Sequence, residues 1–524
     1  MRYGFLHCRR IFRFFLEEAK HRSRGGKRSG KLAASVPKED TIGTSFTRDV
    51  VSLRHDIKQV PYFIRAEIMK FRTVLLLLAW MLGFLPIVAH AVLAQEFMLK
   101  NGMKVIVKED HRAPTVAHMI WYKVGSMDEY NGATGVAHVL EHMLFKGTKT
   151  LKPGEFSQRV AALGGRENAF TSKDYTAYFQ QIEKNRLEQV MALEADRMAN
   201  TIFDKKEFAQ EIRVVMEERR WRTDDQPIPQ VYEALNATAF AAHPYRRPIV
   251  GWMSDLQNMT VQDAKNWYER WYAPNNAIMV VAGDVDPKQV RRLAEKHFGK
   301  IARKNIPTTK PQDEPPQRGI RRVTVKAPAE NPYVVLAFKV PALRDVEKDN
   351  ESHALDVLAA ILDGYDNARL NAKLVRTDKV ANSAGAGYSN VSRGPELFLL
   401  DGTPRVGVTT EQLEKLLRAE VDRIAKEGIS EAELKRVKTQ LVAGQIYKRD
   451  SVFGQAMEIG SMEMSGLSHT QIDRIIEKLK TVTAEQVQAV AQKYFGDDAL
   501  TVATLVPLPL SEGKAPLPLK GLRH

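Results

Sequence analysis

Alternating apolar and polar residues open the part of the chain that follows residue 94. Two short alternating runs over 97–107 meet at Asn101-Gly102, a dipeptide that favours a tight primed turn, so this segment predicts a β-hairpin. Residues 115–124 are largely apolar and predict a further strand. From 134 to 145 the apolar residues recur at helical spacing, which predicts a helix.

Helices and strands continue to alternate downstream. A helix is expected over about 153–163 because Gly164-Gly165 follows it directly. Aromatic residues alternate with polar ones over 169–181, which is typical of strands. We interpret Tyr175, Tyr178 and Phe179 as core residues rather than substrate contacts. Further helices are expected up to about residue 223, and the apolar run 276–283 is typical of a buried strand.

A linker and an internal echo divide this pattern into two units. Residues 305–319 are rich in proline and polar residues and lack apolar periodicity, as expected of an extended linker. On either side of it, residues 120–124 resemble 336–340, and the segment from Thr260 resembles the segment from Thr483. Two matches in the same order predict an internal duplication.

The expected fold class is therefore α+β, with two homologous domains joined by an extended linker. The boundaries drawn from the pattern are 95–304 for the first domain, 320–510 for the second and 511–524 for a tail. With 524 residues, 44% of them hydrophobic, the chain can bury more than one core.

The charge of the chain changes this picture little, because most of the net positive charge lies in residues that precede the two domains. The formal net charge is +15, but residues 1–68 hold 15 Lys and Arg against 7 Asp and Glu, and Lys70 and Arg72 add two positive charges. The rest of the chain is close to balanced. A nucleic-acid-binding protein would concentrate positive charge on its folded domain, so no nucleic-acid partner is expected.

The segment 69–94 has the layout of a signal peptide or membrane anchor. A short basic start at Met69 precedes the apolar run 74–85, and small residues follow up to Ala94. We expect an exported protein, periplasmic or anchored facing the periplasm, and the only expected membrane contact is this segment if it stays uncleaved. A mitochondrial location is the alternative. Residues 1–68 are interpreted as a mispredicted or disordered basic extension.

The motif His138-Val139-Leu140-Glu141-His142 carries the candidate chemistry. Residues four apart share a helix face, so His138 and His142 can offer two imidazole nitrogens to one Zn²⁺. Glu141 projects from the same side and can accept a proton from a zinc-activated water, the order found in inverzincins. The alternative is a helix that merely contains two histidines and a glutamate.

A third ligand must come from elsewhere, because the single cysteine, Cys8, lies in the leader. Glu211 and Glu218 are seven residues apart and share one face of an expected helix. One of these carboxylates can bind zinc while the other supports the site from behind. Glu217 is expected to be solvated.

These residues resemble the pitrilysin/insulysin metallopeptidase family, and most closely its processing-peptidase-like bacterial subgroup. In that family the metal-binding glutamate follows the last histidine by 76 residues, which is the separation of His142 and Glu218. The resemblance implies one Zn²⁺ per chain held by His138, His142 and Glu218. It also implies catalytic roles for Glu141 and for Glu211, and a two-domain chain that forms half of a peptidase chamber.

The resemblance extends to substrate binding. Residues 164–171 resemble the stretch in which an exposed strand edge pairs with the substrate backbone, so Asn168 and Ala169 are expected to bind peptide substrates. Arg376 stands where the family has the arginine of a substrate-binding pair, whereas Asn382 replaces the expected tyrosine. We therefore expect a homologous non-catalytic partner subunit, as a heterodimer, or else a homodimer. His243 can be a cap or surface residue instead of a functional one.

The expected function is zinc-dependent endoproteolysis of short or unfolded peptides, with Glu141 as general base. Aligning the two units places Ala354 and Leu358 where His138 and His142 stand, so the second domain is expected to bind no metal. Two alternatives stay open. One is a non-catalytic structural or assembly subunit of the same fold, and the other is a membrane-tethered binding protein whose zinc is structural.

Overall fold

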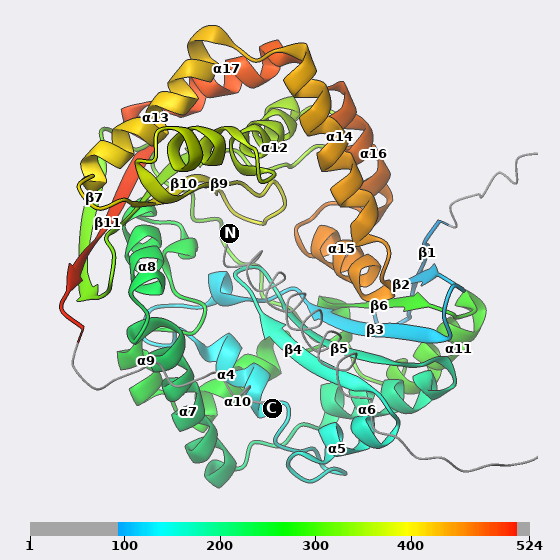
Figure 1. Ribbon diagram of the computed structural model, residues 1–524. Helices are drawn as coiled ribbons and strands as arrows, with labels where there is room; N and C mark the ends of the chain where they lie inside the picture. Colours follow the sequence, from blue (N-terminus) through cyan, green and yellow to red (C-terminus); the bar gives the residue numbers. More distant parts are fainter. Residues whose placement is uncertain (1–92, 511–524) are drawn as a thin grey trace, which may run out of the picture. The chain divides into compact units, whose positions relative to one another are not determined.

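The computed structural model describes residues 93–510, and the first of its two sheets is six-stranded (Figure 1). The strand order is β1-β2-β6-β3-β5-β4, in which β2 and β6 are parallel and every other neighbouring pair is antiparallel. The strands are β1 (Gln95–Met98), β2 (Lys104–Glu109), β3 (Thr115–Tyr122), β4 (Arg166–Thr171), β5 (Thr176–Glu183) and β6 (Ala277–Gly283). The strand β4 therefore forms one edge of the sheet.

The second sheet repeats this arrangement without an equivalent of β1. Its order is β7-β11-β8-β10-β9, with β7 and β11 parallel and the other pairs antiparallel. The strands are β7 (Arg321–Pro328), β8 (Tyr333–Val340), β9 (Ala381–Gly387), β10 (Glu396–Pro404) and β11 (Leu500–Leu508). Because strand order and direction both match, the internal duplication predicted from the sequence is confirmed at the level of topology, and the fold is α+β with two related halves.

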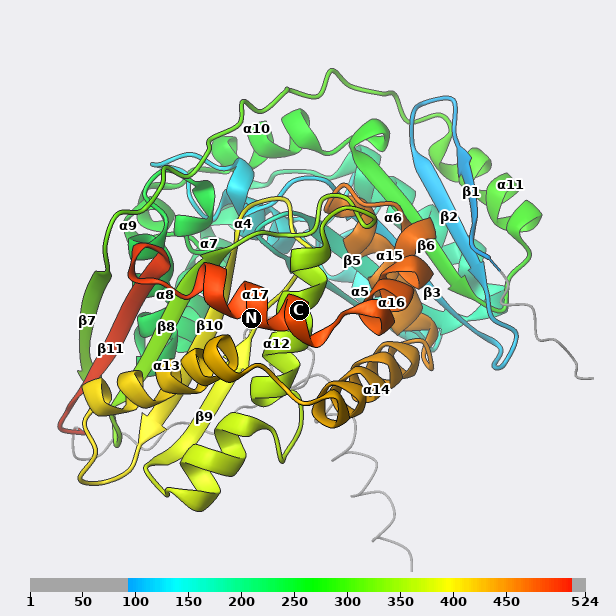
Figure 2. The same cartoon turned by 90° about the horizontal axis from the view of Figure 1, so that it is seen from above.

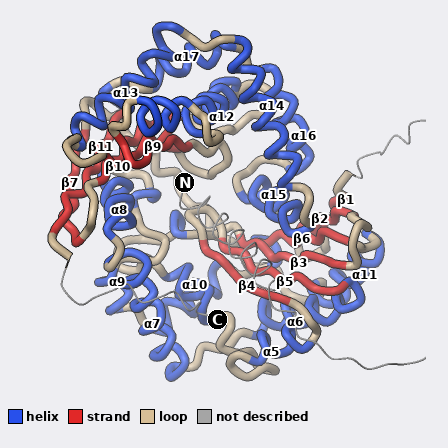
Figure 3. Tube along the Cα trace, viewed as in Figure 1, coloured by secondary structure: helices blue, strands red, loops and turns tan. Residues whose placement is uncertain are grey.

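Helices cover the sheets in both halves (Figure 3). Those of the first half are α4 (Val136–Met143), α5 (Glu155–Ala162), α6 (Leu187–Asn200), α7 (Lys205–Arg219), α8 (Pro227–Ala239), α9 (Met253–Asn258), α10 (Val261–Trp271) and α11 (Pro287–Phe298). Those of the second are α12 (Asn350–Asp363), α13 (Thr410–Glu427), α14 (Glu431–Lys448), α15 (Val452–Met464), α16 (Ile472–Thr481) and α17 (Ala484–Tyr494). The predicted helices and strands are present, with ends shifted by a few residues.

The matching segments from Thr260 and Thr483 start their helices in the same way. Each threonine is the N-cap of its helix, α10 or α17, and forms a capping box with the third helical residue, Asp263 or Gln486. A 3₁₀ turn then leads into β6 or β11. The likeness seen in the sequence is therefore a likeness of capping chemistry as well as of apolar spacing.

The predicted hairpin forms, but its turn is wider than a tight primed turn. Met98 pairs with Lys104, and Leu99 and Met103 are joined by a 2.9 Å backbone hydrogen bond, so three residues make the turn. Gly102 has a φ of +90°, in the left-handed region that favours glycine. Among the described residues, Lys379 is the sole non-glycine residue with a positive φ. Asn101 instead donates its side-chain amide to the carbonyl of Phe298 at 2.8 Å, which fastens the turn to the end of α11.

The two halves exchange one helix each (Figures 1 and 2). The helix α8 of the first half packs on the second sheet, where Leu235 lies in one cluster with Val335 and Ala337. The helix α15 of the second half packs on β3 and β6 of the first sheet, where Ile459 lies in one cluster with Trp121. Each half thus completes the core of the other, and the described residues belong to one compact unit.

The packing of α15 on the first sheet depends on a glycine, Gly460. A Cβ atom on Gly460 would lie 2.0 Å from the indole of Trp121, whose accessible surface is 0%. Overpacking of this kind costs about 1–3 kcal/mol, although alanine favours an isolated helix by about 1 kcal/mol over glycine.

Replacing Gly460 with alanine is therefore expected to lower the free energy of unfolding by about 1–3 kcal/mol, measured from urea denaturation. Gly444 of α14 is a matched control because a Cβ there would meet nothing within 4 Å. The substitution Gly444→Ala is expected to stabilise the protein by about 0.5–1 kcal/mol. Equal stabilisation by both substitutions would show that α15 does not pack on Trp121 in this way.

The segment 305–319 has no regular secondary structure, as predicted, but it is anchored. The carboxylate of Glu314 accepts hydrogen bonds from the backbone N–H groups of residues 241–243, at 2.9–3.0 Å, and from Lys339 Nζ at 2.8 Å. Burial would raise the pKa of Glu314, but these hydrogen bonds outweigh it and lower the pKa to about 2. The linker is therefore held to both halves by one carboxylate.

Several expectations fall on residues that the structure does not describe. The extension 1–68, nearly all of the segment 69–94 and the tail 511–524 lie outside residues 93–510. Within the described part, no helix is long and apolar enough to cross a membrane. The domain boundaries drawn from the sequence stay predictions.

Candidate metal centre

The helix α4 that carries the His-x-x-Glu-His motif begins at a close backbone contact. Gly135, its N-cap, has a φ of +87°, and a Cβ there would lie 2.4 Å from the carbonyl oxygen of Val250. The buried carboxylate of Glu129 accepts hydrogen bonds from the N–H groups of Gly135 and Ala137, at 2.8 and 2.9 Å. It satisfies N–H groups that the first turn of a helix leaves without partners, so the start of α4 is defined in space.

The apolar face of α4 fixes its rotation. All eight residues of the helix are buried, and Val136, Val139, Leu140 and Met143 belong to the main core of the first half. The helix packs against α10, α7 and β4. Because residues three and four apart share a face, this packing turns His138, Glu141 and His142 together away from that core and towards α7 and β4.

Three possible ligand atoms converge at this face. Glu218 Oε2 lies 3.2 Å from His142 Nε2 and 3.7 Å from His138 Nε2. Ligands about 2.0–2.1 Å from a tetrahedral zinc ion would be about 3.3 Å apart. The separations in the structure are close to this value, and two imidazoles with one carboxylate are a donor set that zinc accepts, so these residues fit the metal.

Glu211 supports His142 from behind. Its Oε1 lies 2.8 Å from His142 Nδ1, and its Oε2 lies 2.5 Å from Lys146 Nζ. A hydrogen bond at Nδ1 selects the tautomer whose Nε2 lone pair faces a metal. Glu211 therefore contacts the site through His142 and is not among the three residues whose ligand atoms converge, and its expected catalytic role stays a prediction.

Glu218 is oriented in a similar way by Arg222. Arg222 Nη1 lies 2.5 Å from Glu218 Oε1, the oxygen that does not face the histidines. Arg222 belongs to a π-helical turn (Arg220–Asp224) that follows α7 directly, a feature often found at functional sites. Glu217 is 70% exposed and pairs with Arg220 at the surface, as expected of a solvated residue.

The protonation states reflect this close packing. Burial would lower the pKa of His142, but hydrogen bonds to Glu211 and Glu218 raise it to about 9. Burial would raise the pKa of Glu218, but the hydrogen bond to His142 and the charges of His138 and Arg222 hold it well below its usual range. A dication that binds here must therefore displace a proton from His142, because metal ligation requires neutral imidazole.

Glu141 lies beside the cluster without being part of it. Its Oε2 accepts a hydrogen bond from Thr171 Oγ1 at 2.5 Å, and burial raises the pKa of Glu141 to about 7. The charge of His142 and the Thr171 hydrogen bond oppose this shift. A carboxylate that titrates near neutral pH is suited to accept and release a proton during a reaction.

The expected substrate-binding residues lie on the sheet edge next to this site. Asn168 is exposed and Ala169 half-buried on the edge strand β4, which packs against α4. The side chain of Asn168 accepts a hydrogen bond from the N–H of Ala169 at 2.8 Å. The edge is thus positioned to pair with an extended peptide, although this role stays a prediction.

The structure brings Arg376 into no contact with this site. Arg376 donates to Asn367 Oδ1 at 2.9 Å within the second half, and its role in substrate binding stays a prediction. Ala354 and Leu358 are buried apolar residues of α12, so the second-half counterparts of the two histidines offer no metal ligand.

Neighbouring residues behave as the sequence indicated. Tyr178 has 0% accessible surface, and Tyr175 and Phe179 pack against the cluster that includes α15, so these aromatics are confirmed as core residues. His243 is buried and accepts a hydrogen bond from the N–H of Tyr245, which agrees with a cap.

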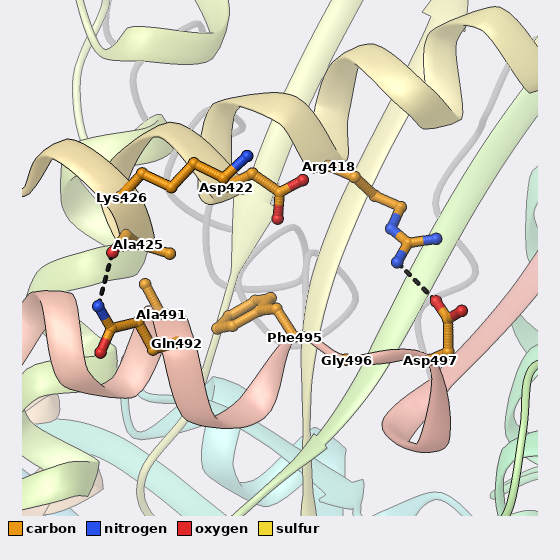
Figure 4. Close-up of a pocket in the computed structure, with 9 residues that line it drawn as sticks. All are labelled: Arg418, Asp422, Ala425, Lys426, Ala491, Gln492, Phe495, Gly496 and Asp497. Carbon is orange, nitrogen blue, oxygen red and sulfur yellow. Dashed lines mark hydrogen bonds and ion pairs between the residues drawn. The ribbon is translucent and has the colours of Figure 1, made fainter.

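Two other places in the described residues offer less. Two polar contacts join residues that line a pocket between α13 and α17 of the second half (Figure 4). Arg418 pairs with Asp497 at 2.6 Å, and Gln492 donates to the carbonyl of Ala425 at 2.7 Å. A second group of possible ligands, Glu96, Glu463 and His469, is occupied by the ammonium of Lys104, which lies 3.0 Å from Glu463.

Sequence reasoning missed three partners of the site: Lys146, Thr171 and Arg222. Lys146 and Arg222 each follow a predicted site residue by four positions, His142 and Glu218 respectively. This spacing is a signal for ion pairs near helical residues and could have revealed Arg222. The contact of Thr171 with Glu141 crosses from a strand to a helix and left no local signal.

Comparison with known proteins agrees with this geometry. The family profile described as "Insulinase (Peptidase family M16)" matches residues 104–251, and the profile described as "Peptidase M16 inactive domain" matches residues 258–441. The chain is 34% identical over 420 residues to the zinc protease PqqE of Helicobacter pylori, which covers 78% of this chain and 92% of that protein. The range matched by the insulinase profile, residues 104–251, contains His138, Glu141, His142 and Glu218.

Solved structures show the same fold. A protease from Helicobacter pylori matches with a TM-score of 0.75 and 32% identity, over 79% of this chain and 100% of that chain. The periplasmic protease PqqL from Escherichia coli matches with a TM-score of 0.69 and 20% identity, over 80% of this chain but 49% of PqqL. This chain thus has the extent of about half of PqqL.

Proposed function

Because the chain belongs to the M16 (insulinase) family of peptidases, we propose that it is a zinc-dependent endopeptidase that hydrolyses short or unfolded peptides. His138, His142 and Glu218 would hold one Zn²⁺, and Glu141 would serve as the general base. The relatives named zinc proteases support the use of zinc. The alternative is a non-catalytic subunit of the same fold.

The observation that carries this proposal is the convergence of three ligand atoms beside a separate carboxylate. Glu218 Oε2 lies within 3.2 and 3.7 Å of the two histidine Nε2 atoms, while Glu141 is engaged by Thr171. Three protein ligands leave the fourth position of a tetrahedral zinc for water or substrate, which is the arrangement of catalytic rather than structural sites. A purely structural subunit has no need for Glu141 beside the three candidate ligands.

When bound, zinc supplies a Lewis acid that acidifies water and polarises the scissile carbonyl. Glu141 accepts the proton of the attacking water and returns it to the leaving amine, and its pKa near neutrality suits both steps. Glu211 and Lys146 keep the Nε2 atom of His142 directed at the site. Arg222 pairs with Glu218 Oε1, while Glu218 Oε2 lies nearest the histidines.

The substrate would add an extended strand to the edge of the first sheet. Asn168 and Ala169 of β4 would bind its backbone, and main-chain hydrogen bonds do not depend on the side chains of the peptide. Binding in an extended form favours short or unfolded chains over folded proteins.

A partner subunit is also part of the proposal. The match covers only 49% of PqqL, which indicates that this relative joins two units, each about the extent of the whole present chain, in one polypeptide. A homologous non-catalytic subunit, or a second copy of this chain, would complete the chamber, and Arg376 would bind substrate as part of that assembly. We further propose that the protein is exported through the segment 69–94, with a mitochondrial location as the alternative.

The test is cleavage of a mixed peptide library by the purified full chain, with zinc, after chelation, and after zinc is restored. Products that require zinc would support the proposed peptidase and reveal its cleavage preference. Bound zinc without products would indicate a missing subunit, and a mixture with the candidate partner would then restore cleavage. The absence of both bound zinc and cleavage products would favour the non-catalytic structural subunit.

A further inference from the structure

The carboxylate proposed as the general base is held by a hydroxyl group from the substrate-binding strand. We propose that Thr171 is a positioning residue for Glu141, and that the second half supports this role by fixing the turn that follows Thr171. This inference rests on the proposed function of Glu141.

The contact between Thr171 and Glu141 is short and shielded. Thr171 Oγ1 lies 2.5 Å from Glu141 Oε2, the hydroxyl donates, and the pair is partly buried. Hydrogen bonds to ionised groups are shorter and stronger than neutral ones. Since the bond engages Oε2, it leaves Oε1 of the same carboxylate as the oxygen that would accept a proton.

Thr171 has little freedom to leave this position. It is the last residue of β4, where it pairs with Thr176 of β5, and a β-branched side chain is restricted at χ1. The same strand carries Asn168 and Ala169, three and two positions earlier respectively. The proposed peptide-binding edge and the hydroxyl that holds the base are thus parts of one short element.

The first half fixes one side of the turn that follows, residues 172–175. The carbonyls of Ser172 and Lys173 accept hydrogen bonds from the N–H groups of Ser126 and Met127, at 3.1 and 2.9 Å. A Cβ on Gly125 would lie 2.6 Å from both carbonyl oxygens, so the two loops approach as closely as glycine allows.

The second half fixes the other side through Arg393, in the connection between β9 and β10. The N–H of Arg393 donates to Asp174 Oδ2 at 3.1 Å, and its guanidinium donates to the carbonyl of Asp174 at 3.1 Å. The guanidinium also binds both oxygens of Asp128, at 2.8 and 3.1 Å. We call these contacts the Arg393 clamp.

Tyr245 adds a further connection to the clamp. Its hydroxyl donates to Asp174 Oδ1 and accepts a hydrogen bond from the N–H of Gly394 at 2.8 Å. Burial would lower the pKa of Arg393, but Asp128 and Asp174 outweigh it and raise the pKa, so the clamp stays charged. The half without metal ligands therefore contacts the turn that follows Thr171 directly.

The first experiment compares Thr171→Val and Thr171→Ser in the zinc-loaded full chain, with steady-state cleavage of a peptide from the library. Valine keeps the shape but removes the hydroxyl, and we expect kcat to fall about 10-fold or more while KM and zinc content change little. Serine restores the hydroxyl and is expected to recover most of kcat. Ser157→Ala is the matched control, because it removes a hydroxyl bound to Glu167 of the same strand.

The outcomes separate this inference from the proposed function. Equal kcat for wild type and Thr171→Val, in a protein that Glu141→Gln inactivates, overturns the role of Thr171 and leaves the peptidase proposal intact. Loss of zinc in Thr171→Val, or failure of serine to rescue, also overturns it. No zinc-dependent cleavage by the wild type, with or without a partner subunit, overturns both.

The second experiment tests the clamp with Asp174→Asn, a shape-preserving change, in wild-type and Thr171→Val backgrounds. If the clamp acts through Thr171, Asp174→Asn lowers kcat in the first background and adds little in the second. Fully additive losses overturn the role of the second half. Urea denaturation of each variant shows that the folded protein is being compared.

Discussion

Replacing Glu141 with glutamine is expected to abolish zinc-dependent peptide cleavage and to leave zinc bound. Glutamine has nearly the same shape but cannot accept the proton of an attacking water, and loss of a general base lowers rates by about 10²–10⁴-fold. Glu141 is not one of the three residues whose ligand atoms converge, so its charge is not needed to hold the metal. The measurements are kcat for a cleaved peptide and zinc content by atomic absorption.

Glu217→Gln is the matched control for this substitution. Glu217 is on α7 next to Glu218, is 70% exposed and pairs with Arg220, so the change removes one carboxylate charge near the site without touching it. Its kcat should equal that of the wild type. Full activity of Glu141→Gln would exclude Glu141 as the base, and loss of zinc from it would show that Glu141 is a ligand.

Replacing Glu218 with glutamine is expected to weaken zinc binding by more than about 100-fold, because it removes a charged ligand. Glu211→Gln should have a smaller effect, about 10–100-fold, since Glu211 acts through the Nδ1 atom of His142. Glu217→Gln should have none. Zinc affinities come from competition with a chelator of known strength, so this series does not depend on turnover.

The order of effects in the series distinguishes the assignments along α7. A larger loss for Glu211 than for Glu218 would exchange their roles as ligand and support. For the wild type, zinc affinity should also rise with pH up to about 9, because hydrogen bonds to Glu211 and Glu218 raise the pKa of His142, and its proton must leave before zinc binds. Affinity that does not change between pH 6 and 9 would contradict this coupling.

The exchange of α8 and α15 makes the cores of the two halves depend on each other. The first sheet buries Trp121 and Met119 under α15, and the second sheet buries Val335 and Ala337 under α8. Separation of the halves would expose both clusters to water, at a cost proportional to the apolar area exposed. The Arg393 clamp adds a contact beside the site to this shared core.

Much of the fold was predictable because its signals are local. Apolar runs over 115–124 and 276–283 identified strands, and helical spacing after residue 134 identified α4. Periodicity follows from the geometry of one element, so it can be read without knowledge of the neighbours. The likeness of the segments from Thr260 and Thr483 revealed the duplication for the same reason, since capping and apolar spacing are encoded within each segment.

The cluster of three candidate ligands was also predictable, for a different reason. His138 and His142 are four apart on one helix, so their proximity follows from helical geometry alone. Glu218 was found through the resemblance to a family, because 76 residues separate it from His142 and no local rule brings it near. The structure then brought the three side chains together.

By itself, the sequence determined which segments form helices and strands, that the chain repeats one unit, and which helix faces carry the candidate chemistry. Only the tertiary structure decided that α8 and α15 cover the opposite sheets, that the hairpin turn has three residues, and that Thr171, Lys146 and Arg222 hold the site. An apolar stripe shows that a helix is buried but not against which surface. Contacts between distant segments depend on how all the elements pack, and packing is a property of the whole fold.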